Sequence, residues 1–133
     1  MKLSKINEIE SKDIDLKKWS DLLLKTPSIQ AQYCEHWYID SISDQWKAYI
    51  LGDYEAAFPC AYKDKLGAKI LYQPFFSRAF AFLGIYNAEF VNHVLERIAD
   101  EYKLIQFNLS KNISDKNWKS STMTYQFLDL KSD

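Results

Sequence analysis

The stretch Leu71–Gly84 holds the residues of this chain that are best suited to a binding site. It reads LYQPFFSRAFAFLG, and it places five aromatic rings around one proline and one arginine. Aromatic side chains bury large areas in protein cores, and they also stack on sugars, peptides or bases. The stretch therefore has two interpretations: the wall of a binding site, or a pair of strands that passes through a core.

Arg78 is the charged residue of this stretch. An arginine among apolar residues needs an anion, a ring face or water, because an unpaired buried charge is costly. We weigh two roles for it: a clamp on an acidic group of a ligand, and, as the favoured interpretation, a side chain whose head reaches solvent beside a core strand. The other candidate binding residues of the stretch are Tyr72, Gln73, Phe75 and Phe76.

Residues for nucleophilic or metal chemistry are few and scattered. Cys34 and His36 are two positions apart on a predicted helix, so their side chains point to nearly opposite sides. His93 is expected on the polar side of its helix, and Cys60 lies in a predicted strand. We therefore predict no metal site. The sequence also contains no phosphate-binding glycine motif and no nucleophile elbow.

Composition excludes several function classes. The chain has 133 residues, a formal net charge of −1 and 47% hydrophobic residues, which predicts one globular domain over residues 1–133. The weak charge argues against nucleic-acid binding, and no apolar run is long enough for a membrane span. The N-terminal segment MKLSKINEIE has no apolar core of the secretory type, so we expect a cytoplasmic protein with reduced thiols.

Hydrophobic periodicity predicts an α+β fold, with helices packed on a mainly antiparallel sheet. Asp15 and Asn87 are expected to cap the helices that follow them, and a further helix is predicted over 33–42. The predicted strands are 2–9, 45–52, 54–62, 68–73, 103–109 and 122–130.

Three features of these strands carry local expectations. Gly52 and Asp53 read as a two-residue hairpin turn. Pro59 has no N–H to donate, so its strand is expected at a sheet edge or with a bulge. The segment 103–109 is almost continuously apolar, which is typical of a strand inside a sheet.

The strings WYIDSISDQWKAYIL, YEAAFPCAYKDKLGAKILYQPFF and YQFLDL resemble the N-terminal half of bacterial acyltransferase-like proteins related to the Fem peptidyltransferases and the GNAT acetyltransferases. The resemblance runs from about Trp19 to Leu130. It implies a GNAT-like domain, half of a tandem architecture, whose cleft takes the acyl acceptor, a peptidoglycan precursor in Fem enzymes. It also implies that Trp37 borders that cleft and that acetyl-CoA or another acyl donor is a possible cofactor.

The chain departs from the family pattern at two places. The segment FLGIYNAEF before the main helix has one glycine, where GNAT enzymes use a glycine-rich loop to hold the donor pyrophosphate. Residues 77–81, SRAFA, stand where family members carry a Gln-Gln-Leu-Gly string. These departures leave open whether the chain is an enzyme, and the residues themselves assign no cofactor and no catalytic group.

Three functions follow from these observations. The first is a domain that is not catalytic alone and that serves acceptor-side binding or packs against a partner, either a second GNAT-like domain or a second copy. Its last predicted strand, 122–130, would offer an edge for such pairing. The alternatives are a self-contained N-acyltransferase that acts as a homodimer, and an aromatic-lined module that binds a small molecule or peptide.

Overall fold

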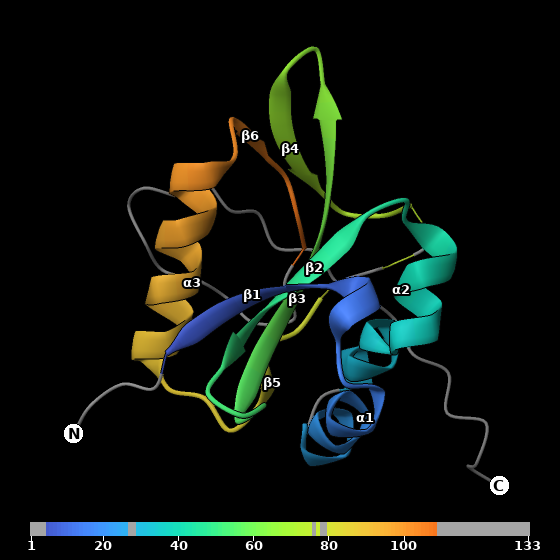
Figure 1. The fold of residues 1–133 in the computed structure, drawn as a ribbon, viewed down its shortest axis with the longest axis vertical. Coiled ribbons are helices and arrows are strands. Elements are labelled where there is room, and N and C mark those ends of the chain that lie inside the picture. Colours follow the sequence, from blue (N-terminus) through green and yellow to red (C-terminus); the bar gives the residue numbers. More distant parts are fainter. Residues whose placement is uncertain (1–4, 27–28, 76, 78–79, 109–133) are drawn as a thin grey trace, which may run out of the picture.

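The chain folds around one mixed sheet, which Figure 1 shows with its helices. The computed structural model describes residues 5–26, 29–75, 77 and 80–108. The strands are β1 (Ile6–Glu10), β2 (Trp46–Leu51), β3 (Ala56–Lys65), β4 (Ala68–Tyr72), β5 (Leu83–Gly84) and β6 (Leu104–Ile105). The helices are α1 (Leu16–Lys25), α2 (His36–Ile42) and α3 (Ala88–Glu101), with short 3-10 helices η1 (Ser11–Asp13) and η2 (Ile29–Cys34). The predicted α+β class is confirmed.

The strand order places β4 next to β6, although β5 and α3 lie between these two strands in the sequence. The sheet runs β1-β2-β3-β4-β6, and β5 pairs with a separate part of β3. All neighbours are antiparallel except β4 and β6, which are parallel. A parallel pair needs a long crossover connection, and α3 lies within it. The crossover brings the carboxyl ends of β4 and β6 together at one edge of the sheet.

Helices cover both faces of the sheet, α1 and α2 on one face and α3 on the other (Figure 1). On the first face, the ring of Trp46 lies 5.7 Å from that of Trp19 and 5.1 Å from that of His36, between ring centroids. On the second face, Tyr62 lies 6.4 Å from Tyr102 at the end of α3. Two covered faces explain why every residue of β2 is buried although its sequence alternates.

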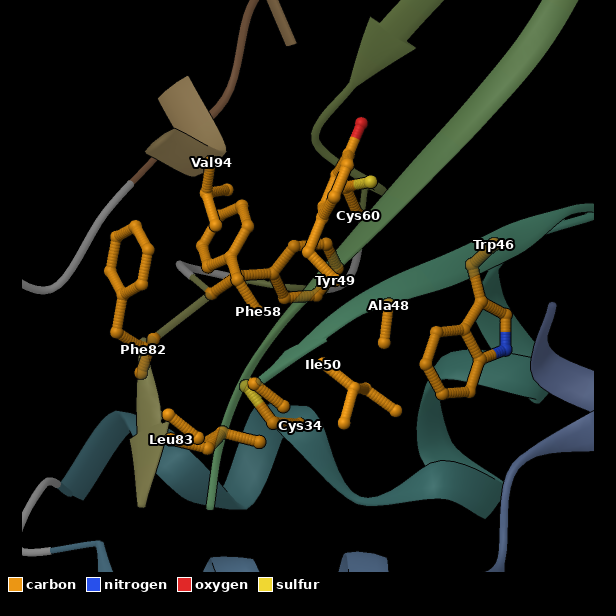
Figure 2. Close-up of a cluster of buried hydrophobic side chains, with 14 of the residues drawn as sticks. Cys34, Trp46, Ala48, Tyr49, Ile50, Phe58, Cys60, Phe82, Leu83 and Val94 are labelled. Atoms are coloured by element: carbon orange, nitrogen blue, oxygen red, sulfur yellow. The ribbon is translucent and has the colours of Figure 1, made fainter. Parts of the chain in front are cut away.

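The packed centre of this arrangement is shown in Figure 2. Ala48 and Ile50 lie on one side of β2, and Tyr49 lies on the other. Phe58 of β3 stacks on Phe82 at a centroid distance of 4.4 Å, and Val94 of α3 lies near these rings in Figure 2. These side chains are at most 4% exposed, so the aromatic residues near β5 belong to the core.

Helices α1 and α3 begin at the predicted capping residues. The Asp15 carboxylate accepts the N–H of Lys18 at 3.1 Å, and the Asn87 amide oxygen accepts the N–H of Phe90 at 2.9 Å. Helix α1 ends before Thr26, whose extended backbone is the conformation expected before a proline. The predicted apolar stripe of α3 is buried at Phe90, Val94, Leu95 and Ile98.

The helix predicted over 33–42 is wrong in its first half. The 3-10 helix η2 ends at Cys34, and Glu35 adopts a non-helical backbone (φ −59°, ψ 134°) before α2 begins. This break rotates the second half relative to the first, so Cys34 and Trp37 do not share a helical stripe. Ile39 is the buried residue of α2, whereas Trp37 is 67% exposed.

The hairpin turn predicted at Gly52-Asp53 is a four-residue loop. Leu51 pairs directly with Ala56, so the loop covers residues 52–55. Gly52 and Tyr54 have positive φ angles of 56° and 61°. The longer loop carries Tyr54 out of the strand, and its hydroxyl accepts the N–H of Asp15 at 2.9 Å. This hydrogen bond joins the loop to the start of α1.

The prediction that Pro59 marks an edge strand or a bulge is wrong, because β3 is central in the sheet. β2 pairs along one side of β3, while β5 pairs with residues 56–57 and β4 with residues 61–65 on the other side. Residues 58–60 pair with neither β4 nor β5. The N–H of Tyr62 points to β2, so alternation turns the nitrogen of Pro59 to the other side, into this gap. The missing N–H thus costs the sheet no hydrogen bond.

The strand predicted over 103–109 is present but short. β6 covers two residues and, within the described ranges, pairs only with β4, so it lies at an edge rather than inside the sheet. Leu104 is 58% exposed, as an edge position allows. Its partner β4 ends before Pro74, which limits the ladder that β6 can join. The strand predicted over 122–130 lies outside the described residues.

Candidate functional site

A pocket of about 320 Å³ opens where the stretch Leu71–Gly84 breaks between two strands. Its lining residues are Tyr72, Gln73, Pro74, Phe75, Ser77, Gln106 and Asn108. Five of them come from the end of β4 and the loop after it, and two from the segment after β6. Parallel strands expose loop groups beyond their carboxyl ends, which is where ligands bind in open α/β sheets. The pocket occupies this position beside the parallel pair of β4 and β6.

Gln73 holds the two sides of the pocket together. Its Nε2 donates to the hydroxyl of Ser77 at 3.0 Å, and its Oε1 accepts the N–H of Asn108 at 2.9 Å. The carbonyl of Asn108 also accepts the N–H of Phe80 at 3.0 Å. Gln73, predicted as a binding residue, therefore does line the pocket, and its amide is committed to bridging the chain segments that form it.

Tyr72 closes the pocket on the side of the sheet. Burial raises the pKa of its phenol, so the hydroxyl stays protonated and able to donate and accept. The ammonium of Lys63 lies 4.9 Å from the centre of its ring, a cation–π contact that fixes the ring against the β3–β4 hairpin. The predicted binding residue Tyr72 is thus a rigid, neutral part of the wall.

The structure separates the remaining predicted site residues. Phe75 lines the pocket and is 92% exposed. Trp37 is not among the lining residues, and its ring packs edge-on against Tyr38 at a centroid distance of 5.5 Å. Phe76 and Arg78 lie outside the described residues.

Three lining residues have no place in the sequence prediction: Ser77, Gln106 and Asn108. The segment that carries Gln106 and Asn108 reads as a buried strand, which directs attention to its apolar residues. The signal that could have found them is the pair of amide side chains at alternate positions directly after β6.

The chemistry of the lining is neutral. It offers amides, a hydroxyl and a phenol, and these described lining residues include no histidine, cysteine, carboxylate or amine. The hydroxyl of Ser77 accepts a hydrogen bond from Gln73 and has no base among the lining residues to activate it. The pocket is therefore suited to binding a neutral polar group rather than to attacking one.

The segment before α3, where a donor pyrophosphate would be expected, is occupied by the protein's own hydrogen bonds. The N–H of Gly84 donates to the Thr26 hydroxyl and that of Ile85 to the Glu55 carbonyl, both at 3.0 Å. Asn87 caps the first turn with its side chain. At Gly84 (φ 80°) a Cβ would meet the Glu55 carbonyl at 2.5 Å. This glycine allows close packing on β3 and does not form a phosphate cradle.

A second polar cluster lies on the α3 face of the sheet, around Lys47. The side chain of Lys47 is 7% exposed, and its Nζ lies 2.6 Å from a carboxylate oxygen of Glu8 and 2.7 Å from one of Glu101. The sequence places Glu101 on the polar side of α3 and gives no signal for this contact. Three tyrosine rings surround the ammonium with centroids 5.3–5.5 Å away: Tyr49, Tyr62 and Tyr102.

The pKa shifts in this cluster are those of an ammonium that stays charged between two carboxylates. Burial alone would lower the pKa of Lys47, but hydrogen bonds to Glu101 and Glu8 outweigh it and raise that pKa. Burial would raise the pKa of Glu101, but the hydrogen bond and charge of Lys47 hold it below its usual value. Lys47 is thus permanently charged, which makes it a link between β1, β2 and α3 and unsuited to act as a general base.

The cysteines and histidines serve packing and local hydrogen bonding. Cys34 and Cys60 are free and buried; burial raises the pKa of both thiols, that of Cys34 to about 12. His36 Nε2 hydrogen-bonds the Ser11 carbonyl at 2.8 Å, and His93 is exposed on α3. In the part of the chain that the structure describes, no three His, Cys, Asp or Glu side chains gather as a metal site would require. Over the same residues, no helix combines the length and apolarity of a membrane span.

Comparisons of the chain with protein-family models, curated proteins and solved structures found no match. The site must therefore be judged from its own geometry. That geometry is a neutral pocket beyond the parallel pair β4 and β6, separate from the ion cluster around Lys47.

Proposed function

We propose that this chain is a GNAT-like domain related to Fem-type acyltransferases, that it binds the acyl acceptor, and that it is not catalytic alone. The observation that carries the proposal is the pocket beyond β4 and β6. Its lining provides neutral hydrogen-bonding groups and one exposed ring, and it lacks a nucleophile paired with a base. Such a lining can hold an acceptor for chemistry that another domain completes.

The chemistry of the lining favours a peptide-like acceptor. A peptide presents N–H donors and carbonyl acceptors, which match the amide of Gln106 and the phenol of Tyr72. Because Gln73 is already committed to Ser77 and Asn108, it preorganises the pocket instead of competing for the ligand. Phe75 adds an apolar surface beside these polar groups.

The segment before α3 supports the second half of the proposal. An acyl-CoA pyrophosphate binds to backbone N–H groups at a helix N-terminus. Here the amides of Gly84 and Ile85 donate to Thr26 and Glu55, and Asn87 caps the helix. Donor binding by this chain alone would have to break these hydrogen bonds.

Isothermal titration tests both halves of the proposal. The purified chain is titrated with acetyl-CoA and, separately, with muramyl pentapeptide as the acceptor probe, while light scattering reports the oligomeric state. We expect saturable binding of the peptide and none of acetyl-CoA. Gln106→Ala should weaken peptide binding about fivefold or more, the effect of losing one hydrogen bond, whereas Gln32→Ala, at an exposed position outside the pocket, should leave it unchanged.

Other results would replace the proposal. Saturable acetyl-CoA binding by a dimer would favour the self-contained homodimeric acyltransferase. Failure to bind the pentapeptide, with binding of another small neutral ligand that depends on Gln106, would favour a binding module of a different kind.

A further inference from the structure

The tip of the β3–β4 hairpin exposes a leucine in an unfavourable backbone conformation. Leu66 is 100% exposed and has a φ of 53°, and Gly67 follows with a φ of 81°. A Cβ added at Gly67 would meet nothing within 4 Å, so the space beside this glycine is open. Figure 1 shows this hairpin projecting beyond the three helices.

Local structure does not explain the leucine. Two positive φ angles are those of a type I′ turn, which favours Asn-Gly because asparagine tolerates the left-handed region far better than leucine. Leu66 therefore costs the hairpin stability where it sits and packs against no part of the core. A single exposed leucine is common on protein surfaces, but one at a strained position on a projecting tip points to a role in contact with something else.

The charge around the tip is strongly positive. Residues 63–69 carry Lys63, Lys65 and Lys69 against Asp64, and Lys103 lies beside them, since its N–H donates to the Lys69 carbonyl at 3.0 Å. The four lysines against Asp64 and Glu101, whose carboxylate lies 3.4 Å from the Lys69 ammonium, leave a net charge of +2 at the tip of a chain whose total is −1.

The lysines are arranged beside apolar side chains. In the register, Lys63 lies opposite Ile70, and Ile70 lies beside Leu104 of β6, so these three share a face of the sheet. Lys65 falls on the same face two positions along the strand. Leu104 is 58% exposed there. Leu66 at the tip, with lysines on the strands next to it, forms the arrangement that lies in a membrane interface. The apolar side chain then sits among the acyl chains and the ammonium groups among the head groups.

We infer that the β3–β4 hairpin tip binds an anionic membrane surface, with Leu66 inserted and Lys63, Lys65, Lys69 and Lys103 facing the head groups. Among residues 63–69 the tip has no aromatic ring on which a base could stack and no arginine to read a base edge. Its charge also opposes pairing with the same tip of a second copy. The inference concerns a surface distinct from the pocket and does not depend on the acceptor proposal.

The association is weak and dependent on salt. Each lysine near an anionic surface changes the partition coefficient about fivefold, as its typical free-energy contribution implies. Because two of the lysines also contact protein groups, Tyr72 and Glu101, the full effect of four is an upper limit. The attraction should disappear at high ionic strength, where charges are screened over a few ångströms.

Vesicle co-sedimentation of the full chain tests the inference. The vesicles are phosphatidylcholine alone and phosphatidylcholine with about a third phosphatidylglycerol, at low salt and at 0.5 M NaCl. We expect binding to the anionic vesicles at low salt only. Leu66→Asn should lower it several-fold while keeping or raising the melting temperature, because it creates the preferred Asn-Gly turn. Lys65→Glu should lower it by more than tenfold, because it removes one positive charge and adds a negative one.

Matched control variants distinguish vesicle binding by the tip from nonspecific binding by other parts of the surface. Leu24 is 85% exposed on α1 and Lys17 is exposed on the same helix, so Leu24→Asn and Lys17→Glu change the same residue types elsewhere. Unchanged binding in these two variants, with loss in the tip variants, supports the inference. Absence of anionic vesicle binding by the unmodified chain overturns it, and so does equal binding by Leu66→Asn or by neutral vesicles. Retention of a single-stranded oligonucleotide without vesicle binding overturns it in favour of nucleic acid.

Discussion

Replacing Lys47 by methionine should destabilise the fold by removing the partner of two carboxylates. Methionine keeps the apolar stem of the side chain, so the packing among the surrounding tyrosines is largely retained. What is lost is the ammonium at 2.6 Å from Glu8 and 2.7 Å from Glu101. The variant therefore measures the electrostatic contribution of the cluster.

The expected loss follows from how much water reaches the carboxylates. Removing one partner of a buried ion pair costs about 3–5 kcal/mol when the other charge is left without solvent. The side chains of Glu8 and Glu101 are 36% and 24% exposed. They also keep weaker neighbours, Arg97 at 4.0 Å and Lys69 at 3.4 Å. We therefore expect a loss of about 2 kcal/mol in the free energy of unfolding.

Urea unfolding followed by tryptophan fluorescence measures this loss. Trp19 and Trp46 are 1% exposed and will report the loss of the core. The free energy extrapolated to water and the slope with urea are compared between variants. Lys69→Met is the matched control: this lysine is 51% exposed and lies 3.4 Å from Glu101, so its loss should cost less than about 0.5 kcal/mol.

The pH dependence gives a second readout. The pKa of Glu101 is lowered in the folded state, so its contribution is present above its unfolded pKa and is lost as the pH falls through the folded pKa. In Lys47→Met, burial is opposed only by weaker neighbours such as Lys69, so the pKa of Glu101 should rise relative to the unmodified protein. The stability gap between the two proteins should therefore narrow as the pH falls from 6 to about 3.

Two results would refute the reasoning. One is an equal loss in Lys47→Met and Lys69→Met, which would mean that the buried contact carries no more stability than the exposed one. The other is failure of Glu101→Gln to restore stability in the Lys47→Met background, where neutralising the carboxylate should recover about 1 kcal/mol.

Two further predictions concern glycine and cysteine positions. Gly84 and Gly67 have nearly equal φ angles of 80° and 81°, but a Cβ at Gly84 would meet the Glu55 carbonyl at 2.5 Å, whereas one at Gly67 meets nothing. Thermal melting should show a loss of about 1 kcal/mol for Gly67→Ala and a loss at least 1 kcal/mol larger for Gly84→Ala; equal losses would contradict the close contact. Cys34 and Cys60 are buried with raised pKa values, so both thiols should react with an aromatic disulfide reagent only after unfolding in urea, and rapid labelling of the native chain would contradict that burial.

The sequence predicted the helices and strands correctly where contacts between residues close in the chain determine their ends. Asp15 and Asn87 cap α1 and α3 because a short polar side chain can reach the N–H three residues on, which is visible from sequence alone. The alternation of side chains over residues 45–52 was likewise sufficient to predict strand β2. The two-residue turn predicted at Gly52-Asp53 was wrong: the loop has four residues and carries Tyr54, whose hydroxyl accepts the N–H of a residue 39 positions earlier. No local pattern contains that contact.

The position of Pro59 shows the same limit in the sheet. The physical rule, that proline must not occupy a position that needs its N–H, holds in the structure. Its consequence depends on how β4 and β5 divide one side of β3, and on the gap that they leave at residues 58–60. An edge strand was one way to satisfy the rule, and a gap inside a central strand is another that the sequence does not distinguish.

Those of the residues predicted from the sequence that line the pocket lie on one wall of it, because that wall is local in the sequence and the other is not. Tyr72, Gln73 and Phe75 share one short stretch, where aromatic and amide side chains around Pro74 stand out. The second wall forms only when β6 pairs in parallel with β4. This pairing brings the residues that follow β6 beside the loop that follows β4. Gln73 is the residue that joins them, since its Oε1 accepts the N–H of Asn108 from 35 positions away. A residue predicted to bind ligand thus joins the two segments that form the pocket, and Gln106, which only its alternation with Asn108 marks in the sequence, lines the second wall.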